Sequence, residues 1–147
     1  MKALIIYKSM HHQNTYRLVK HLHDKYGYDL INVDEINDST NFDEYIYIGI
    51  ASGIYDFEFS KEITELFKKG RIKNKKMFIL YTSAMDKDSF SKNIVKEVSK
   101  ENELIGVYHT KGFCTFAFFK WFGGVNKNRP NENDLATLDL FIDNRIK

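Results

Sequence analysis

Short apolar runs alternate along the chain with longer segments in which apolar residues recur every three or four positions. The runs have the length of buried strands and are expected at Ala3–Tyr7, Asp29–Val33, Tyr45–Ile50, Lys76–Thr82 and Leu104–Phe113. The helical stripes consist of Leu18, Val19 and Leu22; Phe59, Ile63, Leu66 and Phe67; Phe90, Ile94, Val95 and Val98; and Leu135, Leu138, Phe141 and Ile142. This alternation predicts an α/β fold in which helices cover both faces of a parallel sheet.

Helix-boundary signals agree with this pattern. Gly27 and Gly70 follow the first two stripes, where glycine commonly ends a helix. Asn131 and Asp134 stand at N-cap and N3 spacing before the last stripe. Ligands of such sheets bind beyond the carboxyl ends of the strands, so the loops there are the candidate functional segments. These loops are Lys8–Asn14, Ala51–Asp56, Ser83–Asp88 and Cys114–Asn131.

The composition indicates one soluble globular domain over residues 1–147, with 43% hydrophobic and 29% charged residues. No apolar run approaches the roughly 20 residues that cross a bilayer, and the first run is too short for a secretory signal. Cys114 is the single cysteine, so no internal disulfide can form and a cytoplasmic location is expected. A net charge of +2 without a long basic run argues against nucleic acid as a partner.

The loop after the first strand carries the most informative chemistry. It reads Ser9-Met10-His11-His12-Gln13-Asn14-Thr15 and leads directly into the first helix. Backbone N–H groups and the dipole at a helix N-terminus favour anions. Hydroxyl, amide and imidazole side chains in this loop can add hydrogen bonds to phosphate oxygens, which predicts a phosphorylated ligand. A simpler interpretation is that Asn14 or Thr15 only caps the helix and that the histidines lie in solvent.

Several other phosphate or metal sites are excluded or disfavoured. A dinucleotide-binding turn needs G-x-G-x-x-G after the first strand, and no glycine occurs between Met1 and Tyr26. The Walker A pattern is absent as well. A phosphorelay receiver needs acidic residues where this chain has Lys8 and Ser9. A metal site at the adjacent histidines is not favoured, because no Cys or carboxylate pair stands at ligand spacing.

The ordered set of loops resembles the flavodoxins. Their first loop has the form [ST]-x-T-G-N-T, and Ser9–Thr15 is similar to the S-x-H-H-G-N-T variant of small flavodoxin-like proteins. Further segments resemble later parts of that subgroup: Gly49–Tyr55, Tyr81–Ala84, Lys111–Thr115, Gly123–Asn126 and Arg129–Glu132. The resemblance implies a three-layer sandwich with strand order 2-1-3-4-5 and FMN as the cofactor.

The resemblance also implies roles for three loops. The FMN phosphate would be held by Ser9, His11, His12, Gln13, Asn14 and Thr15. The reactive edge of the ring would pass Ser52, Gly53, Ile54 and Tyr55, with Gly53 the candidate for a peptide flip and Tyr55 for stacking. The pyrimidine end would meet backbone groups of Ser83, Ala84, Met85 and Asp86. The alternative is a plain turn at Ser52 and Gly53 with Tyr55 in the core. No catalytic residue and no metal are expected, because the flavin supplies the redox chemistry.

Two departures from the flavodoxin pattern and one unusual loop stand out. Gln13 replaces the loop glycine, which costs roughly 1 kcal/mol or more if that position needs a positive φ. The chain is slightly basic, whereas an acidic face usually steers flavodoxins to basic reductases, so the partner stays open. Aromatic residues crowd the last loop, either as a satellite core, as a cover for the flavin or as a docking patch. They are Phe113, Phe116, Phe118, Phe119, Trp121 and Phe122.

Three functions are compatible with this pattern. The first is an FMN-binding electron carrier between a reductase and an acceptor, both unidentified, in a protein that is a monomer or a weak dimer. The second is an FMN-dependent reductase that acts directly on a quinone, a tetrapyrrole or another conjugated acceptor. The third is a binding module that kept the fold and lost the cofactor.

Overall fold

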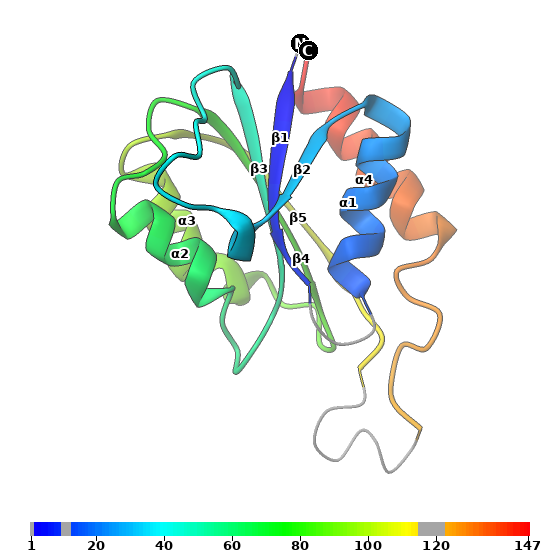
Figure 1. Ribbon diagram of the computed structural model, residues 1–147. Coiled ribbons are helices and arrows are strands. Elements are labelled where there is room, and N and C mark those ends of the chain that lie inside the picture. Colours follow the sequence, from blue (N-terminus) through cyan, green and yellow to red (C-terminus); the bar gives the residue numbers. More distant parts are fainter. Residues whose placement is uncertain (1, 10–12, 115–122) are drawn as a thin grey trace.

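The computed structural model describes residues 2–9, 13–114 and 123–147. They form a sheet between two layers of helices (Figure 1). All pairings of the five strands are parallel, in the order β2-β1-β3-β4-β5. The strands are β1 (Ala3–Lys8), β2 (Asp29–Asn32), β3 (Tyr47–Gly53), β4 (Lys76–Ser83) and β5 (Glu103–Lys111). The predicted fold class and strand order are confirmed.

Each face of the sheet is covered by two helices (Figure 1). On one face lie α1 (Asn14–Tyr26) and α4 (Glu132–Arg145), and on the other lie α2 (Lys61–Lys68) and α3 (Lys92–Ser99). Two short 3-10 helices, η1 (Val33–Glu35) and η2 (Asp88–Ser91), follow β2 and β4. None of the helices in the described ranges is both long and apolar enough to span a membrane.

Two hydrophobic cores result from the alternation of side chains along the strands. Leu4 and Ile6 of β1 pack on the α2 and α3 side, whereas Ala3 and Ile5 pack on the α1 and α4 side. All six residues Met77–Thr82 of β4 are buried, as expected for a strand covered on both faces.

Two helices begin later than the apolar periodicity predicts. Phe90 lies in η2 rather than in α3, and Phe59 lies just before α2. The start of α2 is set by Ser60, whose Oγ accepts a hydrogen bond from the backbone N–H of Ile63 at 3.3 Å. Both phenylalanines still pack against the core, so an apolar stripe reports burial beyond the end of the helix itself.

The carboxyl ends of four strands lie level with one another. In the sheet register Lys8 is opposite Ser52, Gly53 is opposite Thr82, and Ser83 is opposite Lys111. The chain leaves β1 toward β2 on one side, while β3 lies on the other side, so strand order reverses between β1 and β3. The predicted functional loops therefore start along one edge of the sheet, around a topological switch point.

Candidate functional site

The first loop meets the N-terminus of α1, where the first backbone N–H groups have no carbonyl partner in their own helix. Ser9 Oγ accepts a hydrogen bond from the backbone N–H of Tyr16 at 3.1 Å. A hydroxyl both accepts and donates, so Ser9 can cap the helix and still donate to an anion. His11 and His12 lie outside the described residues, and their predicted contacts stay predictions.

Gln13, which stands where the flavodoxin pattern has a glycine, adopts a left-handed backbone conformation. Its φ is 58° and its ψ is 30°, in the left-handed region. Its carbonyl accepts from the backbone N–H of Arg17 at 3.0 Å, while its side chain makes no cap hydrogen bond. The turn into α1 is thus kept by a residue with a Cβ, at a cost of roughly 1 kcal/mol or more.

Asn14 ties the start of α1 to the segment after β5. Its Nδ2 donates to the carbonyl of Phe113 at 2.8 Å, and the backbone N–H of Phe113 donates to its Oδ1 at 3.2 Å. A Cβ on Gly112 would lie 2.6 Å from Asn14 Nδ2, so this close approach requires glycine. The amide that was predicted to bond phosphate is engaged in this clamp, which leaves its second hydrogen and the backbone N–H of Asn14 for an anion.

The side chains of Thr15 and Ser52 are buried and make hydrogen bonds inside the protein. Thr15 is 1% exposed, and its Oγ1 lies 3.2 Å from Thr82 Oγ1. Ser52 is fully buried; its Oγ donates to the carbonyl of Gly53 at 2.5 Å and accepts from the backbone N–H of Ser60 at 3.1 Å. Any contact of these two residues with a ligand therefore has to come from their backbone or from a rearranged side chain.

The peptide that joins Gly53 to Ile54 is held on both sides. The Gly53 carbonyl accepts from Ser52, and the N–H of Ile54 donates to the carbonyl of Thr82 at 3.0 Å. A flip of this peptide would break two hydrogen bonds, which makes Gly53 a poor hinge in this conformation.

The second loop contains a tight hairpin that the sequence pattern did not reveal. Tyr55 and Glu58 exchange two backbone hydrogen bonds, at 2.8 and 2.9 Å. The residues between them, Asp56 and Phe57, have φ values of 50° and 65°. Two positive φ values define a turn of the I′ type, which usually carries Asn or Gly. Phe57 is an outlier in this conformation and is 71% exposed, which marks it as a functional candidate.

The third loop is a compact turn with an exposed apolar tip. The backbone N–H of Asp86 donates to Ser83 Oγ at 2.9 Å, and Asp86 has a φ of 51°. The carbonyl of Ala84 accepts from Asn126 Nδ2 at 3.0 Å. Met85 stands between these anchors and is 44% exposed. The four predicted residues of this loop thus form one turn whose backbone is fixed by its neighbours.

His109 of β5 lies against this turn and was missed by the sequence analysis. Its Nδ1 is 2.5 Å from Asp86 Oδ1, and its Nε2 contacts Asp88. Burial by itself lowers the pKa of His109, but the hydrogen bonds to the two carboxylates outweigh it, so the net pKa is raised. The available signal was a histidine close to the carboxyl end of a strand, next to the candidate loops.

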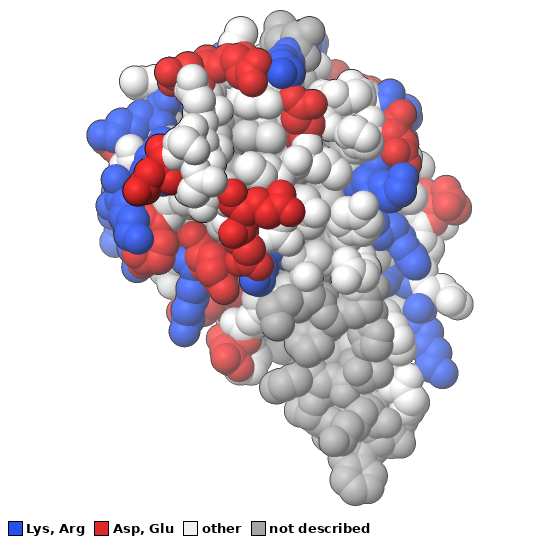
Figure 2. Space-filling model, viewed as in Figure 1, with Lys and Arg blue, Asp and Glu red and all other residues white. Residues whose placement is uncertain are grey.

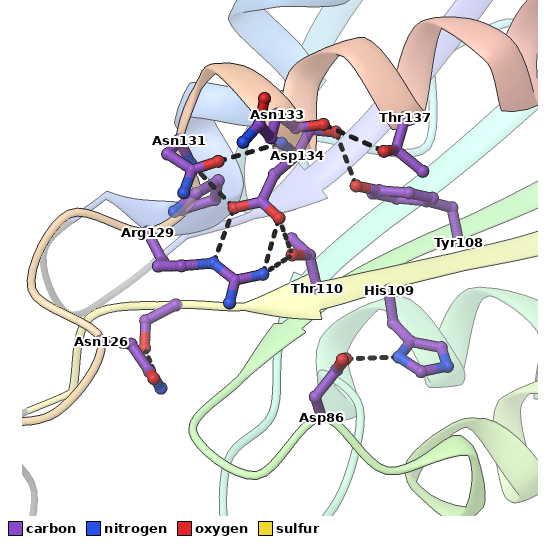
Figure 3. A network of polar contacts seen from close by, with 12 residues as sticks. Asp86, Tyr108, His109, Thr110, Asn126, Arg129, Asn131, Asn133, Asp134 and Thr137 are labelled. Carbon is purple, nitrogen blue, oxygen red and sulfur yellow. Dashed lines mark hydrogen bonds and ion pairs between the residues drawn. The ribbon is translucent and has the colours of Figure 1, made fainter.

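The segment before α4 is anchored by a polar network around Asp134, a residue that is 8% exposed (Figure 3). Asp134 accepts from Arg129 Nη2 at 2.6 Å and from Thr110 Oγ1 at 2.8 Å, and it completes a capping box with Asn131. Burial by itself raises the pKa of Asp134, but the bonds from Arg129, the Asn131 backbone and Thr110 hold it below its usual value. Arg129 is thereby fixed to β5 and to the start of α4. The aromatic residues Phe116, Phe118, Phe119, Trp121 and Phe122 of the last loop lie outside the described residues.

Charge near the first loop is balanced by carboxylates. Lys8 Nζ lies 2.7 Å from Asp34 Oδ2 and 3.8 Å from Glu62 Oε1. The hydrogen bond to Asp34 is the main reason why the pKa of Lys8 is raised. Figure 2 shows acidic side chains gathered over the middle of the viewed face, where η1 and α2 lie in Figure 1. Lys8 therefore offers little uncompensated charge to an anion.

A groove of about 770 Å³ runs along the edge strand β2. Its lining includes Tyr7 and Tyr16 near the first loop. At the other end it includes Asp29, at the start of β2, and Tyr45, which precedes β3. Within the described part of the chain, no three His, Cys, Asp or Glu side chains are arranged to hold a metal ion. The groove lies beside the sheet rather than beyond its strand ends, so the candidate site is placed at the three loops.

One curated protein matches the whole chain. The uncharacterized protein MJ0298 of Methanocaldococcus jannaschii is 38% identical over 150 residues, which cover 100% of this chain and 99% of that protein. No protein-family model matches the chain.

Solved structures that are similar to this chain include flavodoxins and other flavoproteins. A flavodoxin from the domain Archaea is similar with a TM-score of 0.67 at 12% identity, over 97% of this chain and 95% of that one. Oxidised flavodoxin 1 from Bacillus cereus has a TM-score of 0.65 at 10% identity, over 97% and 98%. A flavoprotein from Lactobacillus acidophilus, solved in complex with FMN, has a TM-score of 0.60 at 17% identity, over 74% and 92%. At these identities the similarity shows a flavodoxin-like fold.

Proposed function

The chain belongs to the same family as the Methanocaldococcus jannaschii protein MJ0298, and we propose that it is an FMN-binding redox protein that carries electrons between a reductase and an acceptor. The observation that carries the proposal is the position of its loops. In a sheet of order β2-β1-β3-β4-β5, the polar loops after β1, β3 and β4 start from level strand ends around the switch point. Doubly wound sheets bind their nucleotide cofactors at this place.

The phosphate would be held at the start of α1. Ser9 has a hydroxyl hydrogen to donate, and the backbone N–H groups of Asn14 and Thr15 precede the capped N–H of Tyr16. Gln13 keeps the left-handed turn that brings these groups together. Together with His11 and His12, these uncharged donors suit a phosphate, and the positive end of the α1 dipole adds to the attraction.

The ring would lie between the second and third loops. Ile54 and the hairpin residues Tyr55 and Phe57 offer apolar and aromatic surface on one side, and the turn Ser83–Asp86 offers backbone groups and the exposed Met85 on the other. When bound, FMN supplies reversible one- and two-electron chemistry. The residues of the chain bind and orient the ring and limit its exposure to water.

The hinge that responds to the redox state would lie in the hairpin rather than at Gly53. The backbone hydrogen bonds of the hairpin run between Tyr55 and Glu58, outside the central peptide that joins Asp56 to Phe57. The positive φ values of both residues mean that this peptide is already strained. Its rotation therefore costs less free energy than rotation of the Gly53–Ile54 peptide, which would break two hydrogen bonds.

The test is an absorption spectrum of the purified protein, loaded with FMN and reduced stepwise. A bound flavin spectrum that changes in two separate one-electron stages is expected for a carrier. A colourless protein that takes up no added FMN would refute the proposal. Rapid NAD(P)H oxidation with a quinone and no partner protein would replace the carrier role by that of a direct reductase.

A further inference from the structure

Three consecutive residues of the third loop and η2 are held by a stacked pair of rings from two neighbouring strands. Tyr81 of β4 and His109 of β5 are opposite one another in the register, and their rings stack with centroids 4.7 Å apart at 16°. Tyr81 Oη donates to the carbonyl of Lys87 at 2.5 Å. The two nitrogens of His109 contact Asp86, at 2.5 Å, and Asp88. Figure 3 shows the contact with Asp86 on the opposite side of β5 from the Asp134 network.

The contacts of His109 require a doubly protonated ring. Carboxylate oxygens only accept hydrogen bonds, so each ring nitrogen that bonds a carboxylate has to donate. A neutral imidazole has one N–H, whereas an imidazolium has two. Both contacts are therefore made only while His109 carries its second proton.

The two carboxylates contribute unequally. The side chains of His109 and Asp86 are 20% and 29% exposed, whereas that of Asp88 is 96% exposed. Solvent screens an exposed pair strongly and a sheltered one much less. The contact with Asp86 is the stronger link between His109 and the third loop.

The other ionisable groups around His109 leave this assignment intact. Tyr81 packs on the ring from β4. Lys111 follows two positions along β5 and leaves the sheet on the same face. From the opposite face, Arg129 and Tyr108 interact electrostatically with Asp86. Burial lowers the pKa of His109, and the two carboxylates more than reverse this, so the net pKa is raised.

We infer that His109 is a positioning residue for the candidate flavin site, and that its second proton holds the turn Ser83–Asp86 in the shape that receives the cofactor. The inference rests on the proposed function for the part that concerns flavin. Asp86 joins the clamp to the turn, because its side chain bonds His109 while its backbone N–H bonds Ser83. Its φ of 51° is a conformation that needs such support.

The sign of the pH effect follows from the raised pKa. The clamp is complete below the ordinary histidine pKa of about 6.5. It loses one of its two bonds, and the charge that strengthens the other, as the pH rises through the raised value in the folded protein. Because the bond that His109 donates to Asp86 is charge-assisted and partly buried, Asp86→Asn should weaken FMN binding by roughly five- to tenfold below that pH. Above it the neutral ring has a single N–H and no charge, so its bond to Asp86 is at most an uncharged-donor hydrogen bond, and the difference between the variant and the wild type should shrink.

The experiment has two arms that use the full-length protein. In the first arm, the ring signals of His109, assigned by comparison with His109→Gln, are titrated by NMR without flavin in wild type, Asp86→Asn and Asp88→Asn. The backbone amide exchange of residues 84–87 is measured in the same samples. In the second arm, FMN affinity is measured from pH 5.5 to 9 as the ratio between variant and wild type, which cancels the titration of the phosphate itself, whose pKa is about 6. His21→Gln is the matched control, because His21 also contacts a carboxylate, Asp139 at 2.7 Å, but on the α1 and α4 side.

We expect the pKa of His109 to lie above that of an exposed histidine. Asp86→Asn should lower this pKa more than Asp88→Asn does. The protection factors of amides 84–87, which are corrected for the intrinsic pH dependence of exchange, should fall above the pKa of His109. The ratio of variant to wild-type FMN affinity should rise toward one at high pH for Asp86→Asn but stay at one throughout for His21→Gln. A titration of His109 that Asp86→Asn leaves unchanged, or an affinity ratio independent of pH, would overturn the inference. Absence of FMN binding by the wild type at every pH would refute the proposed function instead, and the NMR arm would then decide the clamp by itself.

Discussion

Gln13 lies at a φ of 58°, where glycine has no steric penalty and a residue with a Cβ pays roughly 1 kcal/mol or more. Its side chain makes no cap hydrogen bond that would offset this. Gln13→Gly should therefore raise the free energy of unfolding by about 1 kcal/mol, measured by urea denaturation. Gln13→Ala is the control and should change it little, because it keeps the strain. An equal increase in the free energy of unfolding in both variants would show that the Gln13 side chain, and not the backbone conformation, is destabilising.

The contact of Gly112 with Asn14 is testable by a double-mutant cycle. A Cβ at position 112 would lie 2.6 Å from Asn14 Nδ2, so Gly112→Ala should destabilise the protein by about 2 kcal/mol. In the Asn14→Ala background the same change should cost much less, because the colliding amide is gone. Additive effects of the two substitutions would show that the clamp is not what requires glycine at position 112.

The hairpin after β3 combines strain with an exposed ring, which gives opposite effects on stability and on binding. Phe57→Gly removes the strain at φ 65° and should keep or increase the free energy of unfolding by up to about 1 kcal/mol. If Phe57 covers the flavin, the same variant should bind FMN at least about tenfold more weakly, because base–aromatic stacking of this kind contributes about 1–3 kcal/mol. Asp56→Gly relieves similar strain without removing the ring and should bind FMN normally. Equal FMN affinity in both variants would remove Phe57 from the site.

The N-terminus of α4 depends on a buried carboxylate. Because Asp134 bonds Arg129, Thr110 and the Asn131 backbone, Asp134→Asn should destabilise the protein by about 3 kcal/mol at neutral pH. Its lowered pKa means that the stabilisation is present above the unfolded-state value of about 3.9 and is lost as the pH falls through the folded value.

Thermal unfolding from pH 2 to 7 checks this, with Glu132→Gln on the first turn of the same helix as the control. The melting temperatures of the wild type and of Asp134→Asn should become equal in acid, while that of Glu132→Gln should stay equal to the wild-type value at every pH. A constant gap between wild type and Asp134→Asn down to pH 2 would contradict the role of the charge.

The strands and helices follow from local patterns and the strand order was implied by the flavodoxin resemblance, whereas much of the site depends on contacts between distant residues. Apolar periodicity located the strands and helices because burial on one or two faces is repeated over several residues. The partners of Thr15 and Asn14 lie 67 and 99 positions away, and no local pattern predicts such pairs. His109 was missed for the same reason, since its partners Asp86 and Asp88 lie 23 and 21 positions earlier, after β4.

At the scale of the whole molecule, the candidate site is made by the sheet rather than by any single motif. The first loop contributes the helix N-terminus and the Ser9 hydroxyl, the second contributes the hairpin, and the third contributes a turn clamped by His109. Each loop alone has a structural explanation. Their start at level strand ends around one switch point is what indicates a shared ligand.

The most direct test of that claim is a fluorescence titration of the flavin-free protein with FMN and, separately, with riboflavin. The two ligands share the ring, and only FMN carries the phosphate that the start of α1 would bind. We predict saturable binding of both, with FMN at least about tenfold tighter, equivalent to about 1.4 kcal/mol, and a loss of most of this preference in Ser9→Ala. No binding of either flavin, or equal affinity for the two, would contradict the account.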